Sequence, residues 1–255
     1  MIKKIYRSKL DIENLSRLRT AIPNGVDNFN YKKIVVVKPW GYEYLMFENS
    51  YVAVWILYLK PNHSTSMHCH PTKKTSLIVL WGFVVCSTLD GWHRLSEGKG
   101  LIIDEAVFHS SKAVSNDGAF IMEIESPPNK KDLVRLKDEY GREHQGYEGK
   151  GKMSLDVSDY NYIDFHDLEI SSRNTKVLKK CKLAIAHHKA VDDIHHKIKN
   201  ESGEIICVLQ GKLHDDNGNV VISAGEAGVL DYVKSVSRIF AFGDVVYLLL
   251  QWQKK

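Results

Sequence analysis

The chain has 255 residues, of which 44% are hydrophobic and 26% are charged, and its formal net charge at pH 7 is +4. This composition is that of a globular protein and excludes disordered and fibrous classes, and the small, interspersed charge gives no indication of nucleic-acid binding. The longest apolar runs, such as Val52–Leu59, are much shorter than the roughly 20 residues of a membrane span. No apolar stretch follows the basic N-terminus and the four cysteines form no C-x-x-C pair, so we expect a cytoplasmic protein without a secretory signal.

Residues 1–30 are predicted to be a helical or irregular lead-in, because apolar residues recur at roughly helical spacing from Leu10 to Leu18 and Pro23-Asn24-Gly25 ends the pattern. Short runs rich in β-branched and aromatic residues follow, separated by Gly, Asn, Asp or Pro. These runs are Ile34–Val37, Val52–Leu59, Ser76–Leu80, Phe83–Thr88, Gly100–Ile103 and Phe120–Ile124. Many short strands with turns between them predict a sandwich or a barrel.

A polar stretch from Ser126 to about Ser172 interrupts this pattern, and in it we predict a short helix over Lys131–Lys137 followed by a long connection. A second β-rich stretch then contains the runs Leu183–Ala186, Ile205–Leu209, Val220–Ile222, Ala227–Leu230, Val236–Phe242 and Val245–Gln251. Within it, Asp215–Asn219 has the composition of a tight hairpin turn.

The two β-rich stretches resemble each other. Leu77–Gly82 is similar to Ile206–Gly211, and Gly98–Asp104 is similar to Gly225–Asp231, with almost the same number of residues between the members of each pair. Two matches at nearly one offset indicate a duplicated domain. We therefore predict a lead-in over 1–30, a first β domain over 31–145, a linker over 146–175 and a second β domain over 176–255.

Histidine is unusually frequent, with twelve residues. His68 and His70 are two positions apart, so in a strand both imidazoles lie on one face, and His109 follows a later strand that could face the same interior. Three neutral imidazoles on one side of a divalent cation leave coordination positions open for substrate or water. The sequence therefore predicts a metal site formed by His68, His70 and His109. The alternative is three unrelated polar histidines.

This spacing resembles that of the cupin family, whose fold is a small double-sheet jelly roll. In the family's first motif, G-x5-H-x-H is followed by three or four residues, Glu, six residues and Gly; here Thr75 stands at the Glu position and Gly82 at the last Gly. In the second motif, G-x5-P-x-G-x2-H-x3-N, the spacing and His109 are kept. Asp104, Ala106 and Ala113 replace its Pro, Gly and Asn. The resemblance covers about residues 35–125 and implies an all-β protein with two such jelly-roll domains in tandem, a short N-terminal lead-in and a polar, partly helical linker.

The segments at both ends of the first domain carry a narrower resemblance. Lys38–Gly41 is similar to the R-P-W-G that opens the cupin part of bacterial mannose-6-phosphate isomerase / mannose-1-phosphate guanylyltransferase proteins, and Asp132–Arg142 is similar to the D-I-V-R-x-x-D-x-Y-G-R that closes it. The resemblance implies sugar-phosphate handling. Nothing in the sequence resembles the Gly-rich nucleotide loop of those proteins, so a guanylyltransferase activity is not implied.

Thr75 leaves the ligand set open. Glu123 or Glu125 could supply a replacement carboxylate, but the sequence does not show which one points inward. Without a carboxylate the site resembles the three-His iron sites of thiol dioxygenases, or else Thr75 weakens metal binding until little remains. The expected cofactor is a divalent metal ion, with Zn, Fe, Mn and Ni all open.

Basic residues are expected to bind an anionic substrate. Arg presents a planar fork to phosphate or carboxylate and Lys a point charge; the candidates are Lys73, Lys74, Arg135 and Arg142, with a solvated loop and a salt-bridged helix as the alternative. Candidate groups for proton transfer are Glu123, Glu125 and, less directly, His63 on the turn before the metal strand.

The second domain has lost the ligand pattern. The repeat maps His68, His70 and His109 to Lys197, Lys199 and Val236. The paired histidines 187–188 and 195–196 fall off this register, and neighbouring strand residues face opposite ways. We expect the second domain to serve as scaffold, lid or dimer surface, so a homodimer is one expected assembly.

Together these residues and resemblances imply a metal-dependent sugar or sugar-phosphate isomerase or epimerase of bacterial surface-carbohydrate metabolism, acting on a small anionic sugar or sugar phosphate and not on nucleic acid or a membrane. Two alternatives remain open at this point: a three-His iron dioxygenase, and a non-catalytic carbohydrate-binding protein whose metal site has decayed.

Overall fold

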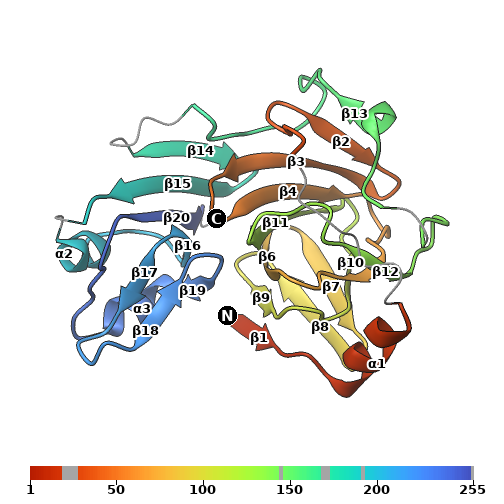
Figure 1. Cartoon of the computed structure of the whole chain (residues 1–255). Coiled ribbons are helices and arrows are strands. Elements are labelled where there is room, and N and C mark those ends of the chain that lie inside the picture. Colours follow the sequence, from red (N-terminus) through yellow and green to blue (C-terminus); the bar gives the residue numbers. More distant parts are fainter. Residues whose placement is uncertain (19–27, 144–145, 168–172, 191–192, 254–255) are drawn as a thin grey trace.

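The computed structural model describes residues 1–18, 28–143, 146–167, 173–190 and 193–253. The fold is all-β, as predicted, and its sheets are stacked around an eight-stranded central sheet (Figure 1). The order of strands in this sheet is β1 (Ile2–Ile5), β9 (Gly100–Ile103), β6 (Lys74–Trp81), β11 (Ala119–Ser126), β4 (Ala53–Leu59), β3 (Gly41–Glu48), β2 (Val35–Lys38) and β13 (Met153–Ser154). One face of it packs against a five-stranded sheet of order β12 (Val134–Lys137), β5 (Met67–Cys69), β10 (His109–Ala113), β7 (Phe83–Thr88) and β8 (Gly91–Ser96), which completes a double-sheet jelly roll.

The other face of the central sheet packs against the C-terminal unit. Its five-stranded sheet has the order β14 (Asn174–Leu178), β15 (Cys181–His188), β20 (Val245–Trp252), β16 (Ile205–Gln210) and β19 (Ala227–Val229). A hairpin of β17 (Lys212–His214) and β18 (Val220–Ser223) turns at Asp215–Asn219, as predicted. The helices are α1 (Lys9–Arg17), α2 (Ile194–Lys199), α3 (Leu230–Ser235) and the 3-10 turn η2 (Lys150–Lys152). None of them, within the described ranges, is long and apolar enough to cross a membrane.

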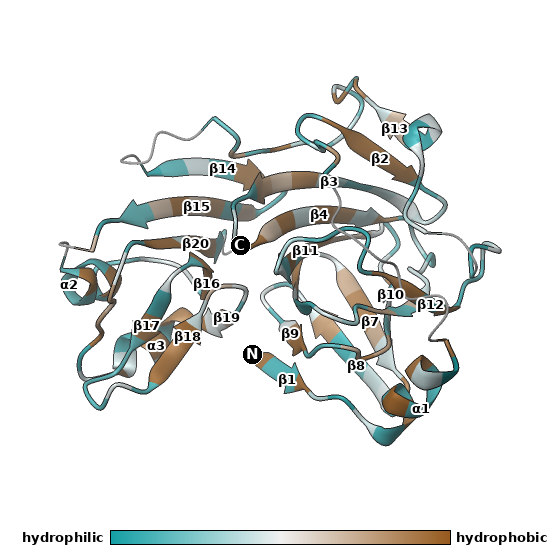
Figure 2. Ribbon diagram, viewed as in Figure 1, coloured by the Kyte–Doolittle hydropathy of each residue, from teal (hydrophilic) through white to brown (hydrophobic). Residues whose placement is uncertain are grey.

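Both faces of the central sheet are covered by another sheet, which explains why β4 is apolar at every position. In β4, Trp55 and Leu57 lie in the core of the jelly roll, whereas Val54 and Ile56 lie in the core shared with the C-terminal unit. Successive side chains of a strand point to opposite faces, so a strand covered on both sides needs an unbroken apolar run. Hydrophobic residues accordingly fill β4 and β20 (Figure 2).

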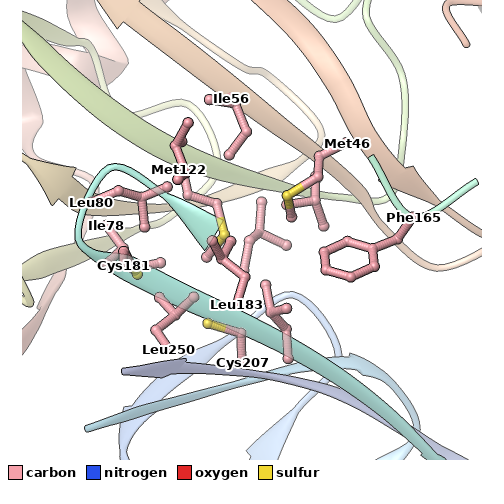
Figure 3. Packing of buried hydrophobic residues seen from close by; sticks show 14 of the residues in the cluster. Met46, Ile56, Ile78, Leu80, Met122, Phe165, Cys181, Leu183, Cys207 and Leu250 are labelled. Carbon is pink, nitrogen blue, oxygen red and sulfur yellow. The ribbon is translucent and has the colours of Figure 1, made fainter. Parts of the chain in front are cut away.

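The core shared by the two units joins strands that are far apart in the sequence. Figure 3 shows Met46, Ile56, Ile78, Leu80 and Met122 of the central sheet packed against Cys181, Leu183, Cys207 and Leu250 of the C-terminal sheet, with Phe165 at one side. Residues 146–167, most of the predicted linker, also contribute structure: β13 pairs with β2, and Phe165 is buried.

The two units arrange five strands in a similar order. The order β9-β6-β11-β4-β3 in the central sheet corresponds to β19-β16-β20-β15-β14 in the C-terminal sheet. Equivalent hydrogen bonds occur in the two units: the Gly98 N–H donates to the Val79 carbonyl at 3.0 Å, and the Gly225 N–H to the Val208 carbonyl at 2.9 Å. By the spacing of the repeat, α2 stands where β5 lies in the first unit, and the irregular stretch 236–242 stands where β10 lies. Neither histidine-bearing strand therefore has a counterpart among the described residues of the C-terminal unit.

Two predicted elements are wrong. Lys131–Lys137 is not a helix, because Val134–Lys137 forms β12 and pairs antiparallel with β5. Val134 and Leu136 pack in one apolar cluster while Arg135 faces the opposite way, an alternation with the period of a strand. Val236–Phe242 is not a strand; within the described residues it makes only an isolated bridge through Phe240, and Phe242 is 84% exposed.

The predicted N-terminal helix is confirmed as α1, while its predicted end at Pro23-Asn24-Gly25 lies outside the described residues. Ser8 and Asp11 form a capping box at its start. The Asp11 carboxylate also accepts a hydrogen bond from the Phe108 N–H at 2.9 Å. Through this contact the lead-in holds the backbone beside His109.

Candidate metal centre

Two neighbouring strands bring the three predicted histidines together inside the jelly roll. His68 lies in β5 and is directly opposite His109 of β10, and His70 follows β5 on the same face as His68. Each ring has a nitrogen within 4.8 Å of a nitrogen of the other two. The ring centroids are 4.6 to 5.5 Å apart. The geometry is that of three side chains converging on one point.

Each ring is fixed by a hydrogen bond from Nδ1 to a backbone carbonyl. The bonds join His68 to Ser66 at 2.8 Å, His70 to Asp132 at 2.6 Å and His109 to Val107 at 3.0 Å. Because a carbonyl only accepts, Nδ1 carries the proton and the Nε2 lone pair is left as an acceptor. This orientation by a partner behind the ring is typical of metal-binding histidines.

The rings are held in the neutral form that a metal requires. Burial is the main cause that lowers the pKa of all three, and for His68 and His70 neighbouring positive charges act in the same direction. The Nε2 atom of His70 is buried and has no hydrogen-bond partner among the described residues. A buried acceptor left unpaired costs free energy, which a cation at this point would recover. The residues therefore fit a divalent metal with nitrogen ligands.

Both candidate carboxylates point into the cavity, because they are two positions apart on β11. Glu123 Oε1 lies 3.8 Å from Nε2 of His70. Glu125 is bound instead by two ammonium groups, at 2.8 Å from Lys73 and 3.2 Å from Lys130. The two residues thus differ in what they can do: Glu123 faces the histidines, and Glu125 is held among cations.

Thr75, at the position where the cupin motif has Glu, is cross-strand neighbour to Glu125. Its hydroxyl is buried without a hydrogen-bond partner in the described part of the chain. The carboxylate nearest the histidine cluster is therefore not at the motif position but on the adjacent strand β11, where Glu123 faces His70.

The remaining predicted residues divide between the cavity and its outside. Lys73, Arg135 and Arg142 line the cavity with the histidines. Lys74 points away, half-exposed, with Asp104 at 3.8 Å. His63 does not line the cavity; its Nδ1 bonds to the carbonyl of Pro61 at 2.8 Å.

Several residues of the cavity lining were not predicted from the sequence: Lys38, Glu43, Lys130 and Tyr147. Glu148, which binds Lys38, was not predicted either, but it does not line the cavity. For Lys38 the sequence did contain an indication, since this residue stands where the similar R-P-W-G motif has Arg. Burial alone would raise the pKa of Glu43, but the neighbouring Lys130 and Lys38 lower it to about 2. In return, Glu125 and Glu43 raise the pKa of Lys130 although burial opposes this. Glu43 and Lys130 thus stabilise each other in their charged forms beside the cavity.

The cavity has a volume of about 60 Å³. At roughly 10–15 Å³ per water, this holds a few waters. Five basic and three acidic side chains line it, so its surplus charge is positive before any metal binds. A small anionic ligand suits that charge.

Comparison with known proteins gives a fold-level likeness. No family model matches the chain, and no curated protein matches it. Among solved structures, a RmlC-like cupin from Shewanella frigidimarina is 13% identical over 40% of this chain and 92% of its own, at a TM-score of 0.35. KdgF from Halomonas sp. is 13% identical over 42% of this chain and 96% of its own, at a TM-score of 0.35. The capsular polysaccharide assembling protein CapF from Staphylococcus aureus is 17% identical over 41% of this chain and 34% of its own, at a TM-score of 0.37. Similarity at this level says nothing about the chemistry of the site.

Proposed function

We propose that this chain is a cupin-type, metal-dependent isomerase or epimerase that moves a proton beside the carbonyl of a small anionic sugar or sugar phosphate. The observation that carries the proposal is a single buried cavity in which three neutral imidazoles present Nε2 atoms next to a carboxylate at 3.8 Å. The site thus combines a metal ligand set with a group able to accept a proton.

The histidines would hold the cation. When bound by His68, His70 and His109, a divalent metal would act as a Lewis acid on a substrate carbonyl oxygen. Glu123 is placed to take a proton from the carbon beside that carbonyl and to return it, since it lies beside His70 while the ammonium groups of Lys73 and Lys130 bind Glu125. Lys73 and Lys130 fix the Glu125 carboxylate and supply positive charge around the substrate.

The same cavity favours proton transfer over the dioxygenase alternative. A site for oxygen activation needs open metal positions but no base, whereas this one has a buried carboxylate beside His70 and a surplus of cations for an anionic substrate. A non-catalytic binding protein would have no use for three oriented, unprotonated Nε2 atoms.

Solvent-proton exchange tests the reaction directly. Metal-loaded protein is incubated in D₂O with mannose 6-phosphate or fructose 6-phosphate, and deuterium at the carbon beside the carbonyl is followed by proton NMR. We expect incorporation in the wild type and a rate at least about 100-fold lower in Glu123→Gln, because general-base catalysis contributes at least that factor. Glu139→Gln, which removes an exposed carboxylate bound to the Ser64 hydroxyl, is the control and should keep the wild-type rate.

Two outcomes would refute the proposal or part of it. Wild-type exchange in Glu123→Gln would remove Glu123 as the base, and oxygen consumption by the iron-loaded protein with these sugars, without exchange, would favour the dioxygenase.

A further inference from the structure

A glycine-rich segment, Gly146–Gly151, closes one side of the metal cavity. It is anchored at three successive residues: the Gly146 carbonyl accepts from Arg135 Nη1 at 2.8 Å, the Tyr147 hydroxyl donates to Glu43, and the Glu148 carboxylate binds Lys38. All three contacts are to residues of the cavity wall. The segment therefore owes its position to polar groups of the site.

Glu148 is surrounded by cations. Its Oε1 accepts from Nη1 of Arg142 at 2.7 Å and lies 3.8 Å from Nη2 of Arg135, and its Oε2 accepts from Nζ of Lys38. The three basic side chains are at most 10% exposed. Three buried cations around one carboxylate form the kind of cage that proteins use for phosphate.

The orientation of Arg142 shows that the cage is built and not incidental. Asp138 binds the other edge of the guanidinium, accepting from Nε at 3.0 Å and from Nη2 at 2.7 Å. The fork is thereby locked, and Nη1 is left to face Glu148. Such a preset donor loses little freedom when it binds an anion.

We propose that Lys38, Arg135 and Arg142 form the binding site for the phosphate group of the substrate, and that Glu148 occupies this site until the substrate displaces it. That the phosphate belongs to a sugar rests on the function proposed above; the anion site itself does not. A phosphate monoester brings up to two negative charges and three terminal oxygens, one for each cation, where the carboxylate brings one charge and two oxygens.

The space on either side of Glu148 explains why displacement is needed. The metal cavity holds about 60 Å³, whereas a groove on the outer side of the segment holds about 710 Å³. Lys38, Arg142 and Tyr147 line both. Moving Glu148 and its neighbours outward would join the two spaces, so that a sugar could reach the histidines while its phosphate lies on the cations.

The segment has the freedom to move. A Cβ built at Gly146, Gly149 or Gly151 meets no atom within 4 Å, so neighbouring atoms do not confine these three residues. Glycine backbone also has the widest range of conformations. The segment is held against the cavity by the Gly146 carbonyl, by the hydroxyl and ring of Tyr147 and by the Glu148 carboxylate.

The test uses inorganic phosphate and chelator-treated protein, so that it does not depend on metal or on turnover. Isothermal titration calorimetry should show that Glu148→Gln binds phosphate at least about tenfold more tightly than the wild type, because an internal competitor that fills the site nine times in ten lowers the apparent affinity tenfold. Glu139→Gln should bind phosphate as the wild type does, and Arg142→Met should lose binding. Acetate should bind more weakly than phosphate in all variants.

A measurement on the wild type alone guards against misfolded variants. Saturating phosphate should speed hydrogen exchange at the amides of Tyr147, Glu148 and Gly149, because the segment is released. Equal phosphate affinity in wild type and Glu148→Gln, or unchanged exchange at saturation, would overturn the proposal, and acetate binding as tight as phosphate would overturn the phosphate assignment. Failure of D₂O exchange together with tight phosphate binding would overturn the proposed reaction alone.

Discussion

Replacing Glu43 by Gln tests whether the charge network under the cavity is as strongly coupled as the structure indicates. Glu43 is 5% exposed and lies 3.3 Å from Nζ of Lys130 and 3.4 Å from Nζ of Lys38. These lysines outweigh the effect of burial and lower the pKa of Glu43 from 4.5 to about 2. At about 1.4 kcal/mol for each unit of pKa, the ionised carboxylate stabilises the fold by about 3 kcal/mol at neutral pH.

The sign of the pH dependence follows from the lowered pKa. The contribution is complete above pH 4.5, where the carboxylate is ionised in both folded and unfolded chains, and it is lost as the pH falls from 4.5 towards 2. The unfolding free energy, measured by urea titration on metal-free protein, should be about 3 kcal/mol lower in Glu43→Gln at pH 7. The difference should shrink steadily below pH 4.5.

Glu13→Gln is the matched control, because Glu13 is an exposed residue of α1. It should change the unfolding free energy by less than about 0.5 kcal/mol. A loss below about 1 kcal/mol in Glu43→Gln, or a difference that stays constant from pH 7 to pH 3, would refute the argument.

Two further predictions concern the core. Leu183→Ala, in the layer between the two units, should lower the unfolding free energy by about 2–5 kcal/mol in urea titration. The control Val177→Ala, at a half-exposed site on β14, should lower it by less than about 1 kcal/mol. Equal effects of the two substitutions would show that the two units do not share a core. Burial raises the pKa of the Cys86 thiol to about 12. The other three cysteines are also buried, and burial raises the pKa of each of their thiols. A thiol reagent at pH 8 should therefore label none of the four within minutes in the native protein and all four in urea; fast native labelling would contradict the buried positions.

The sequence predicted the features that depend on local pattern. The apolar run of β4, the turn at Asp215–Asn219 and the convergence of His68 and His70 all follow from strand periodicity or turn composition. Lys131–Lys137 was mispredicted because a short run with two apolar residues fits a helical or a strand period equally well, and only the partner strand β5 decides.

The charge network could not be predicted because its members are far apart in the chain. Glu43, Lys130 and Tyr147 meet only when β3, the loop after β11 and the later segment are folded together. Alternation shows that Glu123 and Glu125 share a face, but only the packed structure shows that this face is the interior and that lysines hold just one of them.

The C-terminal unit shares its strand order with the central sheet, but its described residues contain no histidine cluster like that of the first unit. Its five sheet strands follow the same order as five strands of the central sheet, yet α2 and the irregular stretch 236–242 stand where the histidine-bearing strands β5 and β10 lie in the first unit. The two adjacent histidines of α2 make other contacts. His195 accepts a hydrogen bond from the Ile239 N–H, and His196 contacts the Asn200 side chain.

The most direct measurement of the central claim is the metal stoichiometry of the chain. Chelator-treated protein is titrated with zinc, iron(II), manganese and nickel by calorimetry, and the metal retained after desalting is counted by elemental analysis. One ion should bind per wild-type chain, and His70→Ala should lose it, because the buried Nε2 of His70 has no hydrogen-bond partner among the described residues and lies with the other two imidazoles. His196→Ala, at an exposed histidine of α2, should bind one ion as the wild type does. Retention of the ion by His70→Ala, or no binding of any of these metals by the wild type, would contradict the account.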